Sequence, residues 1–286
     1  MKWEGQRESN NVEDARGGGR RGLPIGGRGL GVGGIVVALL ASWVLGVNPL
    51  TMLGLMQGGG TQAEAPVGDS QAQDPGYRFV KVVLADTEDV WAAYFQRSGQ
   101  QYQMPRLQVF RGSTDTACGQ GEAAMGPFYC PADRKVYIDL GFFDTLRERL
   151  GAPGDFAQAY VIAHEVGHHL QNLMGTTEKI DRLRGRATER DVNAMSVRLE
   201  LQADCYAGVW THLSQRGKGW LEQGDIEEAL NAAAQIGDDT LQKRSRGTIV
   251  PESFTHGSSA QRVHWFKRGL ESGDLKACDS FSSTAL

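Results

Sequence analysis

The stretch His164-Glu165-Val166-Gly167-His168 is the most informative part of this chain of 286 residues. On a helix, residues four apart lie one above the other, so the two imidazoles and the Glu165 carboxylate converge on one point. Two histidines at this spacing bind Zn²⁺ through ring nitrogens. The glutamate between them acts as general base for a metal-activated water, whose pKa falls toward about 7. The pattern predicts zinc-dependent hydrolysis of an amide bond.

The flanking residues favour a helix around this motif. Gly154 or Asp155 can cap its start, and Gly175 stands where a helix commonly ends. His169 points to another face of such a helix, and we interpret it as structural. Apolar residues recur at helical spacing along the segment, namely Phe156, Tyr160, Val161, Leu170 and Leu173.

A catalytic zinc needs a third protein ligand. The extended metzincin pattern is excluded because its glycine and histidine are replaced by Gln171 and Met174. A second helical run, at about 188–214, carries Glu200 and Asp204 on one face. Such a pair is ordinarily a solvated helix face, but the upstream motif requires a partner. We assign Glu200 to zinc and Asp204 to a ring nitrogen of a motif histidine. The reverse assignment of Glu200 and Asp204 stays open.

Three segments together resemble the bacterial family of neutral zinc metallopeptidases. They read HEVGHHLQNLMG at 164–175, ELQADCYAGVW at 200–210 and THGSSAQRVHWF at 255–266. The opening, MKWEGQRESNNVEDARGGG, is also similar to that family's N-terminus, so the resemblance covers almost the whole chain. It implies a membrane-anchored zinc peptidase of the HExxH gluzincin type. The expected fold is α+β and zincin-like, with a small N-terminal β-sheet before a mainly helical region.

The third segment is similar to a His-plus-Arg segment of membrane-associated gluzincins, in which these side chains face the active site. The resemblance implies that His256 donates a hydrogen bond to the oxyanion formed during hydrolysis. It implies that Arg262 fixes a carboxylate in the cleft, and we place Arg262 with Asp204 behind the metal ligands. In the alternative interpretation, residues 255–259 cap the last helix and His256 only completes a loop.

An apolar stretch near the N-terminus predicts a transmembrane helix. Residues 29–63 carry no charge, and the mostly apolar part is long enough for a bilayer core of about 30 Å. Four arginines precede it at positions 16–28, so the positive-inside rule places the N-terminus in the cytoplasm and the catalytic body outside. The alternative is a signal peptide cleaved near Ala63-Glu64-Ala65, but the apolar stretch exceeds the usual length of such peptides.

These features divide the chain into four parts. We expect a cytoplasmic N-terminal segment at 1–28, a transmembrane anchor at 29–56, a flexible linker at 57–76 and the zinc metallopeptidase domain at 77–286. The net charge of −4 gives no reason to expect nucleic acid as a partner.

Within the domain, the pattern predicts a helix from Asp86 or Thr87 to Ser98 and a small sheet before the zinc helix. We expect the edge strand beside the cleft at about 125–130 or 135–139, where an extended substrate can pair with it. Strands are expected at 106–111, 127–130 and 135–140. Further helices are expected at about 225–236 and 259–270.

The chain has four cysteines, and none forms a CxxC pair. In an extracytoplasmic domain the economical pairing, one of three connectivities, is Cys118–Cys130 and Cys205–Cys278. Four free thiols become the better interpretation if the domain is cytoplasmic.

The predicted function is zinc-dependent hydrolysis of peptide bonds in proteins or peptides of the cell envelope. Zn²⁺ would be held by His164, His168 and Glu200, with Glu165 as general base. The alternative is a zinc-stabilised binding or chaperone-like module without turnover, although a purely structural site has no need of Glu165. A non-peptide amidase of the envelope would use the same chemistry.

Overall fold

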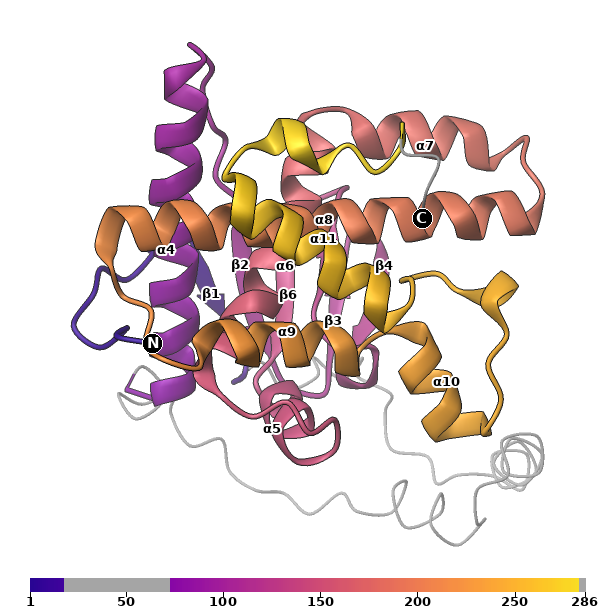
Figure 1. The fold of residues 1–286 in the computed structure, drawn as a ribbon. Coiled ribbons are helices and arrows are strands. Elements are labelled where there is room, and N and C mark those ends of the chain that lie inside the picture. Colours follow the sequence, from indigo (N-terminus) through magenta and orange to yellow (C-terminus); the bar gives the residue numbers. More distant parts are fainter. Residues whose placement is uncertain (18–72, 283–286) are drawn as a thin grey trace, which may run out of the picture. The chain divides into compact units, whose positions relative to one another are not determined.

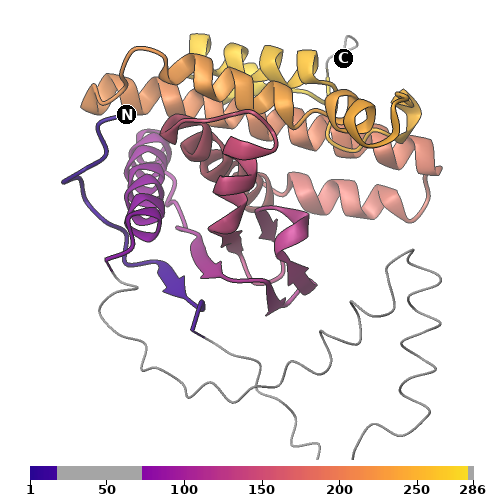
Figure 2. The same cartoon turned by 90° about the horizontal axis from the view of Figure 1, so that it is seen from below.

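The computed structural model describes residues 1–17 and 73–282, and every structural statement below concerns these residues (Figure 1). Residues 1–16 and the chain from residue 71 onward belong to one compact unit. The unit is mostly helical with a small sheet, which confirms the expected α+β class. Figure 2 shows the orange and yellow helices of the C-terminal half in one layer, with the strands on the opposite side of the unit.

Four strands form the main sheet, in the order β1-β2-β6-β5. Their bounds are Val12–Asp14 (β1), Arg106–Phe110 (β2), Lys135–Asp139 (β6) and Phe128–Cys130 (β5). β1, β2 and β6 run parallel, whereas β5 is an antiparallel edge strand with Phe128 opposite Tyr137. In β2 the fully buried Leu107 and Val109 alternate with the half-buried Gln108, as expected for a strand with one face on the core.

The strands predicted at 106–111, 127–130 and 135–140 are therefore present. A separate antiparallel hairpin was not predicted. It consists of Ser113–Thr116 (β3) and Gly119–Glu122 (β4).

Helices make up most of the unit. Their bounds are Pro75–Arg97 (α4), Gly141–Glu148 (α5), Asp155–Leu173 (α6), Thr176–Arg184 (α7), Glu189–Lys218 (α8), Asp225–Gln235 (α9), Asp238–Arg246 (α10) and Ser259–Ser272 (α11). The core lies around α6 and α8, where the fully buried rings of Phe156 and Trp210 stack with centroids 5.9 Å apart. The four helices predicted around residues 155–173, 188–214, 225–236 and 259–270 are confirmed.

Helices α8 and α11 approach each other through two glycines. A Cβ on Gly208 would lie 2.1 Å from the carbonyl oxygen of Phe266, and a Cβ on Gly269 would lie 1.9 Å from that of Cys205. Any side chain at either position would overlap the backbone of the other helix. This contact positions the segment after residue 255 against the helix that carries Glu200.

The cysteines form two disulfides with the expected pairing. Cys118 is bonded to Cys130, and Cys205 to Cys278. The first joins the segment after the β3 strand to β5, and the second fastens the short helical turn Leu275–Cys278 to α8.

The helix predicted from Asp86 or Thr87 to Ser98 begins earlier than expected. Helix α4 starts at Pro75, and its N-cap is Asp74, whose side chain accepts from the backbone N–H of Gly76. Asp86 resembles a cap in the sequence, but it is completely buried in the middle of α4 and accepts a hydrogen bond from the indole of Trp210. A buried polar partner on another helix thus explains this acidic residue.

The predicted domain boundaries also differ from the structure. Residues 1–28 were expected to be separate from a domain at 77–286, yet β1 pairs with β2 inside the same unit. The predicted anchor at 29–56 and most of the predicted linker lie outside the described residues. Among the residues that the structure does describe, none of the helices has the length and apolar character needed to cross a bilayer.

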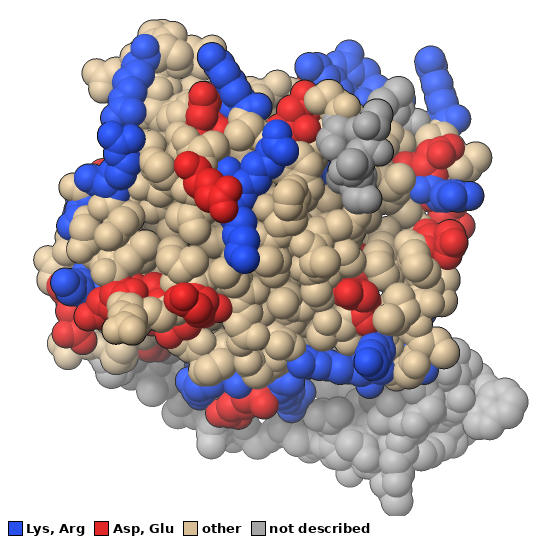
Figure 3. Space-filling model, viewed as in Figure 1, with Lys and Arg blue, Asp and Glu red and all other residues tan. Residues whose placement is uncertain are grey.

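The surface carries both signs of charge. On the face shown in Figure 3, basic and acidic side chains are interspersed and do not gather in a large patch of one sign. This face therefore has no uniform field that would steer a highly charged polymer toward it.

Candidate metal centre

Helix α6 carries the HEVGH motif and passes through the core. It begins after Gly154, which has a φ of 115°, and ends before Gly175, which has a φ of 73°. Both are left-handed conformations that favour glycine, so the two residues limit the helix to the segment between them. Most of its residues between Phe156 and Gln171 are buried, which holds the motif rigidly.

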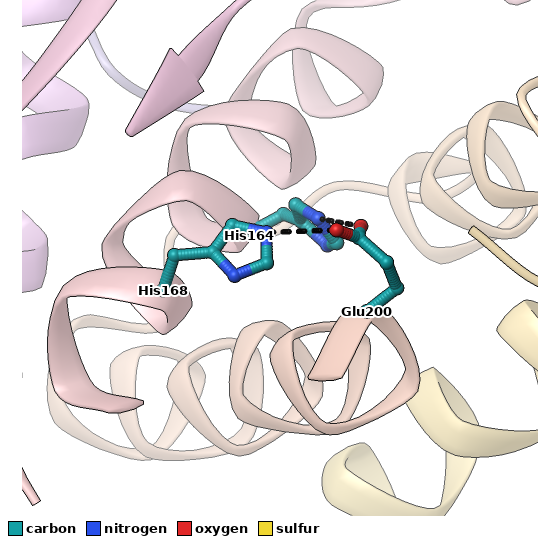
Figure 4. A group of neighbouring side chains, drawn as sticks. All are labelled: His164, His168 and Glu200. Carbon is teal, nitrogen blue, oxygen red and sulfur yellow. Dashed lines mark hydrogen bonds and ion pairs between the residues drawn. The ribbon is translucent and has the colours of Figure 1, made fainter. Parts of the chain in front are cut away.

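The structure brings His164, His168 and Glu200 together. The Nε2 of His164 lies 3.1 Å from Oε2 of Glu200, and the Nε2 of His168 lies 3.5 Å from Oε1 of the same carboxylate. One ligand atom from each of the three residues falls within 4.8 Å of the others. Figure 4 shows both rings extending from α6 toward the carboxylate on α8. Of the two possible assignments of the acidic pair, this geometry places Glu200 with the ligand nitrogens.

A close approach of the two helices sets this distance. A Cβ on Gly167 would lie 3.1 Å from both the Cα and the carbonyl oxygen of Ala203. Gly167 is part of the motif, one residue before His168. The absence of a side chain there lets α8 come near enough for Glu200 to reach both imidazoles.

Asp204 lies behind His164. Its Oδ1 is 2.8 Å from the Nδ1 of His164, and the fully buried carboxylate also accepts from the hydroxyl of Tyr160. An acceptor at Nδ1 keeps the proton there and leaves the Nε2 lone pair free for a metal. Because the Arg262 guanidinium and the His164 ring outweigh the effect of burial, the pKa of the Asp204 carboxyl is lowered.

His168 is held in the same way by a residue that was not predicted. The Oε1 of Gln171 lies 2.9 Å from the Nδ1 of His168, and the Nε2 of Gln171 donates to the backbone carbonyl of Leu199, 2.7 Å away. Gln171 therefore links the second motif histidine to α8. Its position three residues after His168, on the same helix face, is a signal that could have identified it.

Arg262 lies behind the candidate metal ligands with Asp204, as predicted, and it binds a carboxylate. The carboxylate is not in an open cleft, because the Arg262 side chain is buried, with 2% of its surface exposed. Its Nε and Nη2 donate to the two oxygens of Asp204 at 2.8 and 2.9 Å, and Nη2 also lies 3.3 Å from the hydroxyl of Tyr160. The buried carboxylate accepts two hydrogen bonds from the guanidinium. Arg262 therefore acts behind the candidate metal ligands and does not face a substrate.

Glu165 projects beside the two imidazoles, and 7% of its surface is exposed. Burial raises the pKa of its carboxyl, whereas the nearby His168 and His164 rings act in the opposite direction. A partly desolvated carboxylate at this position is a suitable proton acceptor.

His256 forms a pair with Asp238, which was not predicted. The Nδ1 of His256 lies 3.2 Å from Oδ1 of Asp238, and the side chain of His256 is 53% exposed. The hydrogen bond that the His256 ring donates to Asp238 raises the pKa of the ring, and the charge of Glu200 adds to this effect. His256 is not among the residues that converge as metal ligands. Asp238 stands at the start of α10 without a recognisable motif, so only the tertiary structure reveals the pair.

The same Asp238 organises the loop before α11. Its Oδ2 accepts from the backbone N–H groups of Thr255, His256 and Gly257 at 2.7, 2.6 and 3.0 Å. A capping box of Ser258 and Gln261 then begins α11. The predicted capping role of this segment and a defined orientation of the His256 ring are therefore both present.

His169 has the structural role that the sequence indicated. It is fully buried, with its Nε2 2.6 Å from the carbonyl oxygen of Gln103 and its Nδ1 3.0 Å from the hydroxyl of Tyr129. Burial lowers the pKa of the His169 ring to about 4. Asn172 donates to the same hydroxyl at 3.0 Å, so two residues of α6 hold Tyr129 of the edge strand β5.

Comparison with known proteins agrees with this geometry. The profile of a family described as "Putative neutral zinc metallopeptidase" matches residues 1–281. The chain belongs to this family. It is 51% identical to the uncharacterized protein YpfJ of Escherichia coli K12, over 99% of this chain and 100% of that protein. It is 38% identical to the uncharacterized protein Rv2575 of Mycobacterium tuberculosis H37Rv, over 85% of this chain and 86% of that protein. No solved structure matches the chain.

The residues present fit the zinc that the family description implies. Two imidazole nitrogens and one carboxylate are the donors of a three-residue catalytic zinc site, with a fourth position for water or substrate. The bonds of Nδ1 to Asp204 and Gln171 direct both Nε2 atoms toward Glu200.

A second acidic group is already satisfied within the chain. Asp155, Asp225 and Glu228 also lie within 4.8 Å of one another. Asp155 and Asp225 accept from the amine of Met1 at 2.8 and 3.3 Å, and Glu228 accepts from the backbone of Phe156. This group therefore stays outside the metal site.

Proposed function

We propose that this chain is a zincin of the gluzincin type that hydrolyses peptide bonds in proteins or peptides of the cell envelope. The observation that carries the proposal is the convergence of His164, His168 and Glu200 on one point, with Glu165 close enough to both rings for their charges to act on the pKa of its carboxyl. The family description supports a zinc metallopeptidase, and the donor set supports a catalytic metal with an open position.

Each of these residues has its own role in the proposed hydrolysis. Bound zinc supplies Lewis-acid polarisation of water and of the substrate carbonyl. A carboxylate oxygen of Glu165 takes a proton from the attacking water and passes it to the leaving amine. When the His256 ring carries both protons, its Nε2–H donates a hydrogen bond to the carbonyl oxygen as negative charge develops there. The hydrogen bond of Nδ1 to Asp238 favours this doubly protonated ring, since it raises the pKa of His256.

The edge strand β5 supports an extended peptide as substrate. It pairs only with β6 in the sheet, and the bonds of Tyr129 with His169 and Asn172 hold it against the zinc helix. An extended chain that adds to the outer edge of β5 would therefore run alongside α6. Main-chain hydrogen bonds of this kind bind peptides with little dependence on their side chains.

The proposed location in the envelope is supported by two features. Both pairs of cysteines form disulfides, which persist in oxidising compartments. Residues 29–63 carry no charge, a composition suited to contact with lipid.

The first experiment compares the full chain with Glu165→Gln, both loaded with zinc, in hydrolysis of an unstructured protein. The full chain is required because β1 contributes to the sheet. We expect hydrolysis by the native chain, at least about 10³-fold less by Glu165→Gln, and equal zinc content in both. Glu178→Gln, on an exposed face of α7, should retain full activity. Zinc bound by both proteins without hydrolysis by either would favour the binding-module function. Equal hydrolysis by both would remove Glu165 from the mechanism.

A further inference from the structure

The first sixteen residues, here called the N-terminal arm, are built into the catalytic body. β1 of the arm pairs in parallel with β2, with Val12 opposite Leu107. The amide of Leu107 donates to the carbonyl of Asn11 at 2.9 Å, and the amide of Ala15 donates to the carbonyl of Val109 at 2.8 Å. The arm therefore completes one side of the sheet, and without it β2 would expose unpaired backbone groups.

The arm also satisfies a buried carboxylate. Glu88 on α4 is 1% exposed. Among the described residues, its side-chain oxygens accept from Arg7 at 2.9 Å, Ser9 at 2.6 Å and Asn11 at 2.7 Å, all of which belong to the arm. A buried charge that loses its partners strongly destabilises the folded protein. The body is thus built to hold the arm.

Charges along the arm match charges on the body. The acidic Glu8 bonds to Lys81 at 2.8 Å and to Arg78 at 3.0 Å, and the acidic Glu13 bonds to Lys135 at 2.7 Å. These ion pairs explain part of the charged sequence of the arm, since Glu8 and Glu13 each meet basic side chains of the body.

The two residues that flank the segment 17–73 are in contact. Arg16, the last residue of the arm, forms an ion pair with Asp74, the N-cap of α4. Its guanidinium is 4.8 Å from the ring centroid of Tyr77, and 3% of its side chain is exposed. The chain therefore leaves the body at residue 16 and returns to it at residue 74, at adjacent points.

We propose that the N-terminal arm and the catalytic body lie on the same side of the membrane. The chain between residues 16 and 74 would then not connect two compartments by a single crossing. A single crossing would require the arm to leave β2 and Glu88. The positive-inside rule treats the charge of Arg16 as one that orients the chain in the membrane. In the structure this charge is neutralised by ion pairs with Asp74 and Asp14.

The test places a cysteine on each part of the full chain in its native membrane. Gln6→Cys marks the arm and Gln100→Cys marks the body, and both positions are exposed. The native cysteines are all bonded, so a membrane-impermeant maleimide reports only the new thiol. Equal labelling in intact cells, or equal protection that permeabilisation relieves, is expected and would support the proposal. Labelling of one site with protection of the other would overturn it. If Gln6→Cys does not fold, Asn10→Cys, also exposed, replaces it.

A matched pair of variants tests the packing itself in the purified full chain. Glu8→Lys breaks the ion pairs with Arg78 and Lys81, whereas Glu4→Lys changes an exposed arm residue without a described partner. We expect Glu8→Lys to lower the melting temperature and Glu4→Lys to leave it unchanged. The same effect from both would mean that the arm does not bind the body, and the proposal would fail. Neither measurement depends on peptidase activity, so the arm and the proposed function are tested separately.

Discussion

The guanidinium of Arg262 binds both carboxylate oxygens of Asp204, at 2.8 and 2.9 Å, in the interior of the protein. Because the same carboxylate accepts from His164, this candidate metal ligand is connected to α11 through two buried side chains. The metal site therefore depends on the packing of α6, α8 and α11 together.

We predict that Asp204→Asn weakens zinc binding by about 10–100-fold, the usual effect of removing a carboxylate behind a ligand histidine. The change also leaves Arg262 without its partner, so the free energy of unfolding should fall by about 3–5 kcal/mol. Competition with a chelator measures the affinity, and urea titration measures the stability. Glu189→Gln, exposed on the same helix, is the control. Unchanged zinc affinity in a folded Asp204→Asn protein would contradict the role of Asp204.

His256→Ala should lower kcat by about 10²–10³-fold and leave the zinc content unchanged, since the histidine lies outside the ligand set. His264→Ala, exposed on α11, should change neither quantity. Hydrolysis assays with metal analysis measure both effects. A loss of zinc in His256→Ala would show that the residue supports the metal site and does not stabilise the reacting oxygen.

Stability should fall when the pH is lowered from 6.5 to 4. The pKa of His169 is about 4 in the fold against its ordinary 6.5, so in this window the unfolded chain binds a proton that the folded chain does not. The free energy of unfolding should therefore drop by up to about 3 kcal/mol as the pH falls. Urea titration at pH 7 and pH 4.5 measures the loss. His169→Gln, which does not titrate, should show a smaller loss, and an equal loss would exclude His169 as the cause.

Gly269→Ala should destabilise the protein by more than about 3 kcal/mol, because the new Cβ would lie 1.9 Å from the carbonyl oxygen of Cys205. Gly217→Ala is the matched control. No atom outside its own helix backbone and chain neighbours lies within 4 Å of a Cβ there, so alanine should stabilise α8 by about 0.5–1 kcal/mol. Thermal unfolding compares the two variants. If both behaved alike, the close contact of α8 with α11 would be wrong.

The two disulfides should contribute unequally to stability. Cys205–Cys278 closes 73 residues and Cys118–Cys130 closes 12. Chain entropy alone gives about 4 and 3 kcal/mol, respectively. Paired Cys→Ala variants under non-reducing conditions measure each contribution by urea titration. If a reductant did not change the urea unfolding of the unmodified chain, the result would show that the bonds are not formed.

The zinc helix illustrates what local patterns predict well. The spacing of His164 and His168, the apolar positions around them and the glycines at both ends all act within one helix, whose period fixes which side chains share a face. Glu200 was predicted through a second helical pattern and a family resemblance. By contrast, the roles of Gln171 and Asp238 were not predicted, and the pairing of Arg262 with Asp204 in particular was not specified, since the sequence spacing does not indicate which helices are in contact.

The N-terminal arm was misinterpreted for a related physical reason. A three-residue strand such as β1 is too short for a periodic signal, and a buried acid such as Asp86 looks like a helix cap until its partner Trp210 is known.

The sequence by itself determined the main helices and the placement of His164, Glu165 and His168 on one of them, and so predicted zinc chemistry, because these features depend on residues that are neighbours along one helix. The tertiary structure alone decided which carboxylate Arg262 binds, what orients His256 and why residues 1–16 belong to the body. These features arise from contacts between distant segments, and only the packed chain specifies them.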